Sequence, residues 1–245
     1  MITVNTKRGY SLYINDPSKC AVSKELLHRK EWNKSGMDFL KNSVKKGDIF
    51  IDGGAHIGTF SLYAALLGCT VISFEPDKDN FSLLSQNIKL NNFNNATLIN
   101  NGISDSEGEF KQLRNEENYG DHRILTNIKL ETNSSMPTVP ITTIDNTLLS
   151  LSIDHINFLK LDIQGCEVKA LKGARNIISN STGAKFYIEY WPEGLSFQGN
   201  TFLDFYEELE KQGIFVYHGE KQFTKNDFLT NRNTSFFCDL IGEKR

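Results

Sequence analysis

The stretch from Asp48 to Pro76 constrains the fold of this chain more than any other. An apolar run at 49–51 predicts a short buried strand, and three glycines fall within the next seven residues, Asp52-Gly53-Gly54-Ala55-His56-Ile57-Gly58. Glycine lets the backbone turn tightly and approach a ligand, because no Cβ intervenes. A helix expected over Thr59–Leu67 and a second strand expected over Thr70–Phe74 complete a unit that presents its turn to a ligand.

Glu75 directly follows that second strand, where a carboxylate can accept hydrogen bonds from both hydroxyls of a ribose. The unit therefore predicts a pocket for a nucleoside-bearing cofactor, and two cofactors fit. The spacing of Gly53, Ala55 and Gly58 suggests a nicotinamide dinucleotide. Asp52, however, would lie close to a pyrophosphate and repel it. S-adenosylmethionine has no pyrophosphate, and its ammonium group favours a carboxylate at the turn, so Asp52 favours this second cofactor.

Length and composition are typical of one globular protein. The chain has 245 residues, with a hydrophobic content of 39% and a charged content of 23%. The formal net charge is -3 and no long basic run occurs, which disfavours nucleic acid as the main partner. No apolar segment is long enough to cross a bilayer, and the first residues lack a signal-peptide core, so no membrane partner is expected. The four cysteines have no metal-ligand spacing, and a reducing, cytoplasmic setting is the simplest interpretation.

The first 45 residues are expected to form a cap on a single domain. A β-hairpin is predicted over 2–14, followed by a polar, helical stretch over 23–46. Residues 1–45 are too few for a core of their own, so residues 46–245 form the main domain.

From Gly47 onward, strand and helix patterns alternate, which predicts a doubly wound, mostly parallel α/β sheet. Seven strands are expected, at 49–51, 70–74, 96–100, 156–161, 184–190, 214–217 and 234–240. Helices are expected at 59–67, 79–90, around 168–178 and at 202–212. A polar loop with no obvious helix joins the last two strands, so they should pair antiparallel. A dinucleotide fold would continue with another parallel unit, whereas a terminal hairpin is the layout associated with S-adenosylmethionine-dependent methyltransferases.

The connection between the third and fourth strands, residues 102–155, is unusually long. Long connections in compact domains are often functional, and this one leaves the edge of the sheet where open α/β sheets bind ligands. It is expected to face the substrate, with a small hairpin of its own. His122 and Arg123 lie in it and are predicted to contact the substrate, and His122 is a candidate base.

Several motifs, in order along residues 48–190, resemble the FkbM family of methyltransferases. They are Ile51 to Gly58, Phe74-Glu75-Pro76, Gly102-Ile103-Ser104-Asp105 with Gly108, Thr142-Thr143-Ile144-Asp145, and Phe158 to Glu167. Two positions depart from the family pattern: His56 stands where an Asn-like residue is usual, and Gln164 stands where Glu is usual. The resemblance implies a Rossmann-like class I fold and S-adenosylmethionine-dependent methylation, most often of a hydroxyl on a sugar or related natural product.

Methyl transfer to a hydroxyl requires an aligned nucleophile and is helped by a positioned base. Asp162 ends the fourth strand and is the first candidate for that base, and Glu189 in the fifth strand and His122 are further catalytic candidates. Two acids on neighbouring strands are a weak metal signal, so no metal is expected. Cofactor contacts are expected from Asp52, Gly53, Gly54, Ala55, His56, Gly58, Glu75, Pro76, Asn101, Gly102 and Asp162. Substrate contacts are expected from His122, Arg123, Gln164 and Trp191.

The sequence thus predicts an O-methyltransferase whose partner is a small-molecule or glycan acceptor. Two alternatives remain open at this point. One is a nicotinamide-dependent oxidoreductase, and the other is a non-catalytic cofactor-binding module.

Overall fold

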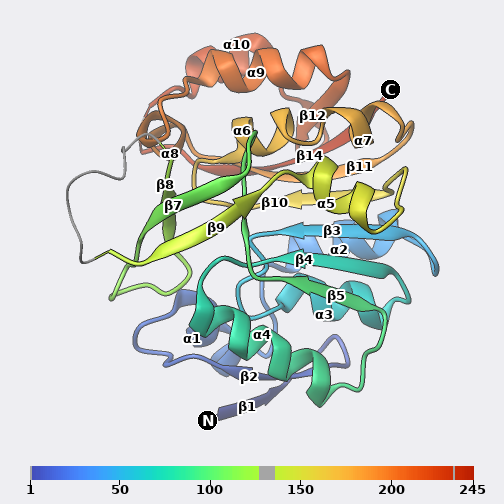
Figure 1. Cartoon of the computed structure of the whole chain (residues 1–245), viewed down its shortest axis with the longest axis vertical. Helices are drawn as coiled ribbons and strands as arrows, with labels where there is room; N and C mark the ends of the chain where they lie inside the picture. The colour runs from blue at the N-terminus through green and yellow to red at the C-terminus, as the bar shows by residue number, and fades with distance from the viewer. Residues whose placement is uncertain (1, 127–135, 234) are drawn as a thin grey trace.

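A central sheet with eight strands organises the computed structural model, which describes residues 2–126, 136–233 and 235–245 (Figure 1). In spatial order the strands are β13 (Lys221–Gln222), β12 (Ile214–His218), β14 (Cys238–Lys244), β11 (Lys185–Tyr190), β10 (Phe158–Leu161), β3 (Ile49–Gly53), β4 (Thr70–Phe74) and β5 (Ala96–Ile99). The strands from β11 to β5 are parallel, and β14 runs antiparallel to both of its neighbours. The doubly wound sheet with an antiparallel edge is therefore confirmed.

The edge of the sheet differs in detail from the sequence prediction. The expected seven strands become eight, because the two-residue strand β13 pairs with β12. The loop after β13 is not free of helix, since α10 (Lys225–Thr230) begins there with a capping box between Thr224 and Asp227. The strand expected at 234–240 begins instead at Cys238, and Thr234 lies outside the described residues.

Two helical layers cover the two faces of the sheet, and successive residues along a strand pack against one layer and then the other. Ile51 and Leu159 face one layer, whereas Phe50 and Phe158 face the other. The first layer holds α5 (Ile144–Ser150), α6 (Glu167–Lys172), α7 (Arg175–Ser179), α8 (Pro192–Phe197) and α9 (Phe202–Lys211), and the second holds α2 (Lys34–Ser43), α3 (Thr59–Leu66) and α4 (Lys78–Leu90). The single helix expected around 168–178 is divided into α6 and α7 at Gly173, where a Cβ would lie 2.1 Å from the Ser104 carbonyl oxygen.

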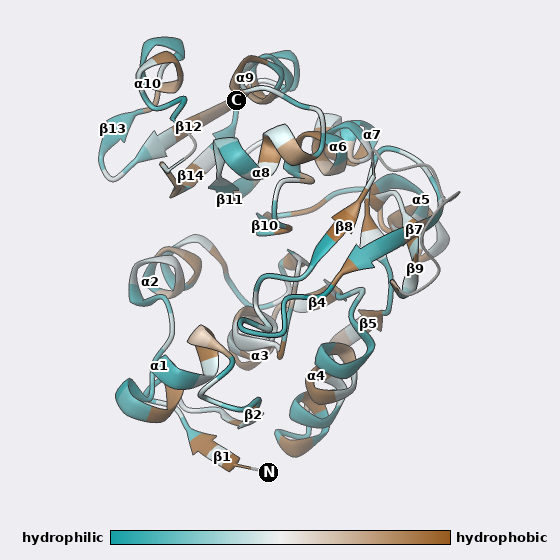
Figure 2. Ribbon diagram, turned by 90° about the vertical axis from the view of Figure 1, so that its left-hand side faces the viewer, coloured by the Kyte–Doolittle hydropathy of each residue, from teal (hydrophilic) through white to brown (hydrophobic). Residues whose placement is uncertain are grey.

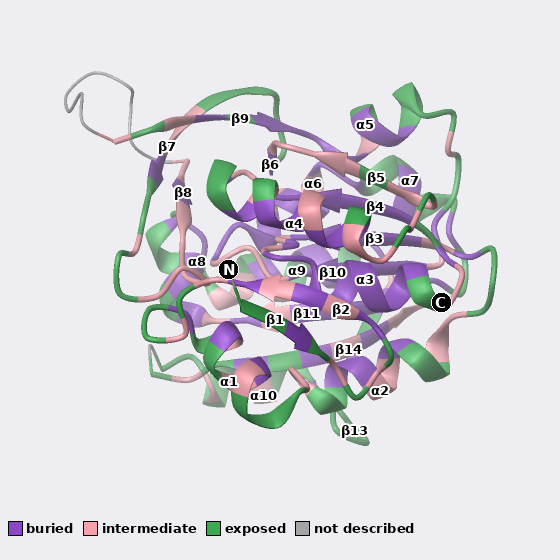
Figure 3. Cartoon of the chain, turned by 90° about the horizontal axis from the view of Figure 1, so that it is seen from below, coloured by how far each residue is buried: buried purple, intermediate pink, exposed green. Residues whose placement is uncertain are grey.

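The first 45 residues pack onto the second layer. Strands β1 (Ile2–Asn5) and β2 (Ser11–Ile14) form the expected hairpin, with its exposed side along β1 (Figure 3). The helical stretch expected at 23–46 is two helices, α1 (Ala21–Arg29) and α2, because the backbone between them is left-handed at Lys30 and Asn33. Buried cap residues share one hydrophobic cluster with α3 and α4, so the cap and the main domain have a common core.

The long connection forms a second, smaller sheet. Its strand order is β6 (Gly102–Ile103), β9 (Thr138–Thr142), β7 (Gly108–Leu113) and β8 (Arg123–Leu125). Strands β7 and β8 pair antiparallel, as the expected small hairpin; residues 127–135 of this connection lie outside the described part of the chain. Figure 2 shows β1, β2 and α1 of the cap at the opposite end of the molecule from α9 and α10. No helix in the described residues is long and apolar enough to span a membrane.

Candidate active site

A cavity lies where the parallel strands end at their carboxyl termini. Its wall combines the residues that follow β3, β4, β5 and β10 with Val22 and Trp32 of the cap, and with residues 114–122 between β7 and β8, which we call the strap. Of the predicted site residues, those that line it are Asp52, Gly54, Ala55, His56, Glu75, Pro76, Asn101, Gly102, His122, Asp162 and Gln164. Gly53, Gly58, Arg123, Glu189 and Trp191 do not line it.

The turn after β3 is a tight corner that only small residues can form. Gly54 has a φ of 76°, and a Cβ on it would lie 2.0 Å from the Asp162 carbonyl oxygen. The N–H groups of Gly54 and Ala55 both donate to the Phe74 carbonyl oxygen. Gly58, with a φ of 96°, then begins α3 without a side-chain cap. Gly54 is thus required by the close approach of the chain after β10, and it leaves the backbone itself as part of the cavity wall.

Glu75 is a buried carboxylate with spare acceptor capacity. Its Oε2 accepts from the His56 N–H at 2.7 Å and its Oε1 accepts from the Asp77 N–H at 2.9 Å. Burial is the main cause that raises the pKa of Glu75 to about 7, against the lowering effect of these two hydrogen bonds. Each oxygen keeps a lone pair for a further donor.

Asp52 lies beneath the corner in a buried network. Its Oδ2 accepts from the Ser61 hydroxyl at 2.6 Å, and its Oδ1 lies 3.0 Å from Lys160 Nζ. Sequence reasoning did not assign Lys160 a role. The available signal was a lysine in the middle of a buried strand, which needs a charged partner, and the register of β10 with β3 places Lys160 opposite Asp52.

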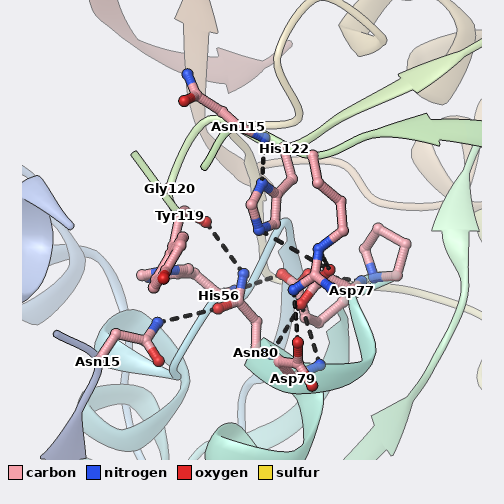
Figure 4. Close-up of polar contacts among 12 residues, drawn as sticks. Asn15, His56, Asp77, Asp79, Asn80, Asn115, Tyr119, Gly120 and His122 are labelled. Carbon is pink, nitrogen blue, oxygen red and sulfur yellow. Dashed lines mark hydrogen bonds and ion pairs between the residues drawn. The ribbon is translucent and has the colours of Figure 1, made fainter. Parts of the chain in front are cut away.

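The strap closes one side of the cavity through contacts with α4 and the cap (Figure 4). The Arg114 guanidinium lies 3.1 Å from Asp77 Oδ2. Asn80 Nδ2 donates to the Tyr119 carbonyl oxygen at 3.2 Å, and the Tyr119 N–H donates to the Lys19 carbonyl oxygen at 2.9 Å. The strap is therefore attached both to the start of α4 and to the cap.

The two histidines in the cavity wall differ in their partners. His122 Nδ1 accepts from the Asn115 N–H at 3.0 Å, so the neutral ring carries its proton on Nε2, which lies 3.8 Å from Asp77 Oδ2. Burial lowers the pKa of His122, although Asp77 opposes that shift. Burial lowers the pKa of His56 to about 3, and its Nε2 lies 3.8 Å from Cys20 Sγ. Both rings are uncharged at neutral pH.

Acidic side chains gather at the ends of β10 and β11. Gln164, whose backbone is left-handed with a φ of 56°, donates through Nε2 to Asp162 Oδ1 at 3.0 Å and to Glu189 Oε2 at 3.3 Å. Burial, followed by the charge of Asp162, raises the pKa of Glu189 well above its ordinary value. Glu167 is also buried, and its Oε1 accepts from the N–H groups of Ile163 and Gly165. A single amide therefore joins the two predicted catalytic carboxylates.

Arg123 and Trp191 meet outside the cavity. The Arg123 guanidinium lies 4.5 Å from the centre of the Trp191 ring and 5.2 Å from that of Phe197, and it forms a bidentate ion pair with Asp121 at 2.8 and 2.9 Å. The Trp191 ring, which was expected to contact a substrate, is thus already in contact with the guanidinium group of Arg123.

Comparison with known proteins decides the family. A family model described as the methyltransferase FkbM domain matches residues 52–215, which is more than half of the chain. The chain belongs to the FkbM methyltransferase family. A search of curated proteins finds no match.

One solved structure with a TM-score above 0.5 agrees with the class I methyltransferase fold. A candidate methyltransferase from Streptococcus mutans, crystallised with SAH, aligns over 86% of this chain and 97% of its own, with 15% identity and a TM-score of 0.52. An rRNA methylase from Streptococcus thermophilus aligns over 86% of this chain and 94% of its own, with 15% identity and a TM-score of 0.49. The FkbM methyltransferase is an S-adenosylmethionine-dependent enzyme, which confirms the predicted cofactor and sets the nicotinamide alternative aside.

The cavity of this FkbM methyltransferase has the groups that such a cofactor needs. The free lone pairs of Glu75 match two ribose hydroxyl donors, and the corner at Gly54 leaves no side chain in the path of a ligand. Among the described residues, no group of three or more His, Cys, Asp and Glu side chains is arranged to hold a metal ion.

Proposed function

We propose that this FkbM methyltransferase methylates a hydroxyl group of a sugar, a glycan or a related natural product. The observation that carries the proposal is the pair Asp162 and Gln164 at the wall of the cavity, with Gln164 also donating to Glu189 behind that wall. It offers a carboxylate base beside the site where the cofactor would bind.

The order of the strands suggests how the cofactor would lie. Asn101 follows β5, Glu75 follows β4, Gly54 follows β3 and Asp162 follows β10, and these strands are neighbours in that order. The adenosine part would then lie near Asn101 and Glu75, and the amino-acid end near the corner. S-adenosylmethionine supplies a methyl group on a positively charged sulfur. The acceptor would approach over the ends of β10 and β11.

Asp162 is the best-placed general base among the three catalytic candidates. It lines the cavity and accepts one hydrogen bond through Oδ1 from Gln164, so it can accept the proton of an acceptor hydroxyl and make that oxygen more nucleophilic. The raised pKa of Glu189 favours its protonated form, which suits a supporting role. His122 directs its ring nitrogens toward Asn115 and Asp77, which suits a role in ordering the strap.

The charges at the site favour a neutral acceptor over an anionic one. Of the cavity-lining residues that the structure describes, Lys160 is the one lysine or arginine, and it is paired with Asp52. Asp162 and Glu75 add negative charge. An acceptor rich in phosphate, such as nucleic acid, would be repelled. The four unpaired cysteines support a cytoplasmic setting as part of this proposal.

Methyl labelling can test the proposed acceptor class. The protein would be incubated with radiolabelled S-adenosylmethionine and a cell extract separated into RNA, protein, glycan and small-molecule fractions. We expect label in the glycan or small-molecule fraction, removed from glycans by glycosidase treatment. Label confined to RNA or protein would contradict the proposed acceptor, whereas no labelling and no binding of S-adenosylhomocysteine would contradict the cofactor site itself.

A further inference from the structure

The ammonium group of Lys160 makes its close polar contacts with the corner and with Asp52. It forms an ion pair with Asp52, and Nζ donates to the Gly53 carbonyl oxygen at 3.2 Å and to the Gly54 carbonyl oxygen at 3.0 Å. Two of the three donors of the ammonium group are therefore directed at the corner.

Lys160 remains charged although its side chain is only 4% exposed. Burial lowers its pKa, but the carboxylates of Asp52 and Asp162 outweigh burial and raise it overall. The other oxygen of Asp52 accepts a hydrogen bond from the Ser61 hydroxyl, so the protein contacts both oxygens of this carboxylate. The pair is neutral as a unit, so Asp52 does not act as a free negative charge in the cavity.

The corner is held from two directions. The Asp162 carbonyl group packs against Gly54 so closely that a Cβ would lie 2.0 Å from its oxygen. Lys160 Nζ donates hydrogen bonds to the carbonyl oxygens of both Gly53 and Gly54. The Lys160 side chain thus adds to the backbone hydrogen bonds that hold the corner, one of which runs from the Asp162 N–H to the Gly53 carbonyl oxygen.

We propose that Lys160 is a positioning residue of the cofactor site, which fixes the Gly53 and Gly54 carbonyls and cancels the charge of Asp52, so that the corner fits the amino-acid end of S-adenosylmethionine. This inference rests on the cofactor arrangement proposed above, in which that end lies between Glu75 and Asp162.

Comparing the affinities for two ligands can distinguish a positioning role of Lys160 from a general contribution to the stability of the fold. S-adenosylhomocysteine carries the amino-acid end, whereas 5′-methylthioadenosine has the same adenosine and thioether without it. The variant Asp52→Asn/Lys160→Met removes both charges together and leaves no unpaired buried ion. By calorimetry, we expect its affinity for S-adenosylhomocysteine to fall about 10- to 100-fold and that for 5′-methylthioadenosine to fall less than about 3-fold.

Stability measurements give a second readout on the protein without ligand. Lys160→Met alone leaves the Asp52 carboxylate buried and unpaired, so its melting temperature should lie below that of the double variant. A matched control is Arg175→Met/Glu208→Gln, which removes an ion pair of 2.6 Å between α7 and α9, on the other helical layer. It should lower the melting temperature and leave both ligand affinities unchanged.

The proposal is overturned if Asp52→Asn/Lys160→Met binds both ligands as the wild type does, or loses affinity for both to the same degree. Wild-type protein that binds neither ligand would instead refute the proposed cofactor site and remove the basis of this inference.

Discussion

On the two sides of the cavity, the strand ends are held together by different kinds of contact. At the ends of β3 and β4, backbone groups dominate: the Gly54 and Ala55 N–H groups bind the Phe74 carbonyl, and two further N–H groups bind Glu75. At the ends of β10, β11 and β14, side chains bind side chains. There, Gln164 joins Asp162 to Glu189, Arg123 stacks on Trp191, and Asn33 and Tyr187 both donate to Asp239.

We call the ends of β3 and β4 the constant half of the site and the ends of β10, β11 and β14 the adjustable half. Backbone contacts depend on the path of the chain and change little when a side chain is replaced. Side-chain contacts change with every substitution, so the β10–β11 half can be altered for a new acceptor while the cofactor half stays the same. Variants in the first half should therefore affect cofactor binding, and variants in the second half should affect turnover or the acceptor.

Asp162→Asn, in the adjustable half, should give the largest effect on turnover. Loss of the base should lower kcat by about 100- to 10,000-fold at saturating acceptor. Glu189→Gln is the matched control, because an amide resembles the protonated acid that the raised pKa favours, and it should lower kcat less than about 10-fold. Equal losses in the two variants, measured by steady-state kinetics, would show that Asp162 is not the distinctive base.

Glu75→Gln tests the constant half. Glu75 accepts hydrogen bonds from two N–H groups, one on each oxygen. The amide of glutamine has a single acceptor oxygen, so fewer lone pairs remain to accept hydrogen bonds from the ribose hydroxyls. Affinity for S-adenosylhomocysteine should fall about 10- to 100-fold, with the acceptor KM unchanged. Asp79→Asn, at an exposed carboxylate in the first turn of α4, should leave the affinity unchanged. Calorimetry that finds no difference between the two variants would remove Glu75 from the binding site.

The pKa of Glu75 predicts how pH acts on the constant half. Its folded value of about 7 exceeds its ordinary value of 4.5 because the carboxyl group is buried. Hydroxyl donors favour the carboxylate, so S-adenosylhomocysteine affinity should rise with pH up to about 7 and fall up to about tenfold per unit below it. Glu75→Gln should flatten this profile.

The raised pKa of Glu75 has the opposite effect on the stability of the ligand-free protein: rising pH lowers this stability, whereas it raises the ligand affinity. A carboxyl group whose pKa is raised on folding stabilises the fold below pH 4.5, and this contribution is lost as the pH rises through about 7. The difference in melting temperature between wild type and Glu75→Gln should therefore change across this range. A difference that is constant from pH 5 to 8 would contradict the raised pKa.

Trp191→Ala should give the smallest effect. The stack with Arg123 is partly exposed, and such cation–π contacts are worth about 0.5–1 kcal/mol, so the acceptor KM should rise about 2- to 5-fold. Affinity for S-adenosylhomocysteine should stay the same, since Trp191 does not line the cavity. A loss of cofactor affinity in this variant would show that the two halves do not act separately, contrary to the comparison above.

The constant half was readable from sequence because its parts are local. The three glycines and the strand-end acid Glu75 lie within 23 residues of one another, counted from Gly53, and strand–turn–helix periodicity places them. Lys160 was missed because its partner Asp52 lies on another strand, and pairing between strands follows from the fold as a whole. The contact of Arg123 with Trp191 was missed for the same reason. Helix α10 was missed because six residues are too few to show a clear period, although the Thr224–Asp227 box was present.

All four cysteines are buried and unpaired. A thiol introduced at Glu116, an exposed position in the strap, would therefore be the readily accessible one in the folded protein. A fluorophore attached there would report whether the surroundings of the strap change when S-adenosylhomocysteine is added, without the need to remove any native cysteine first.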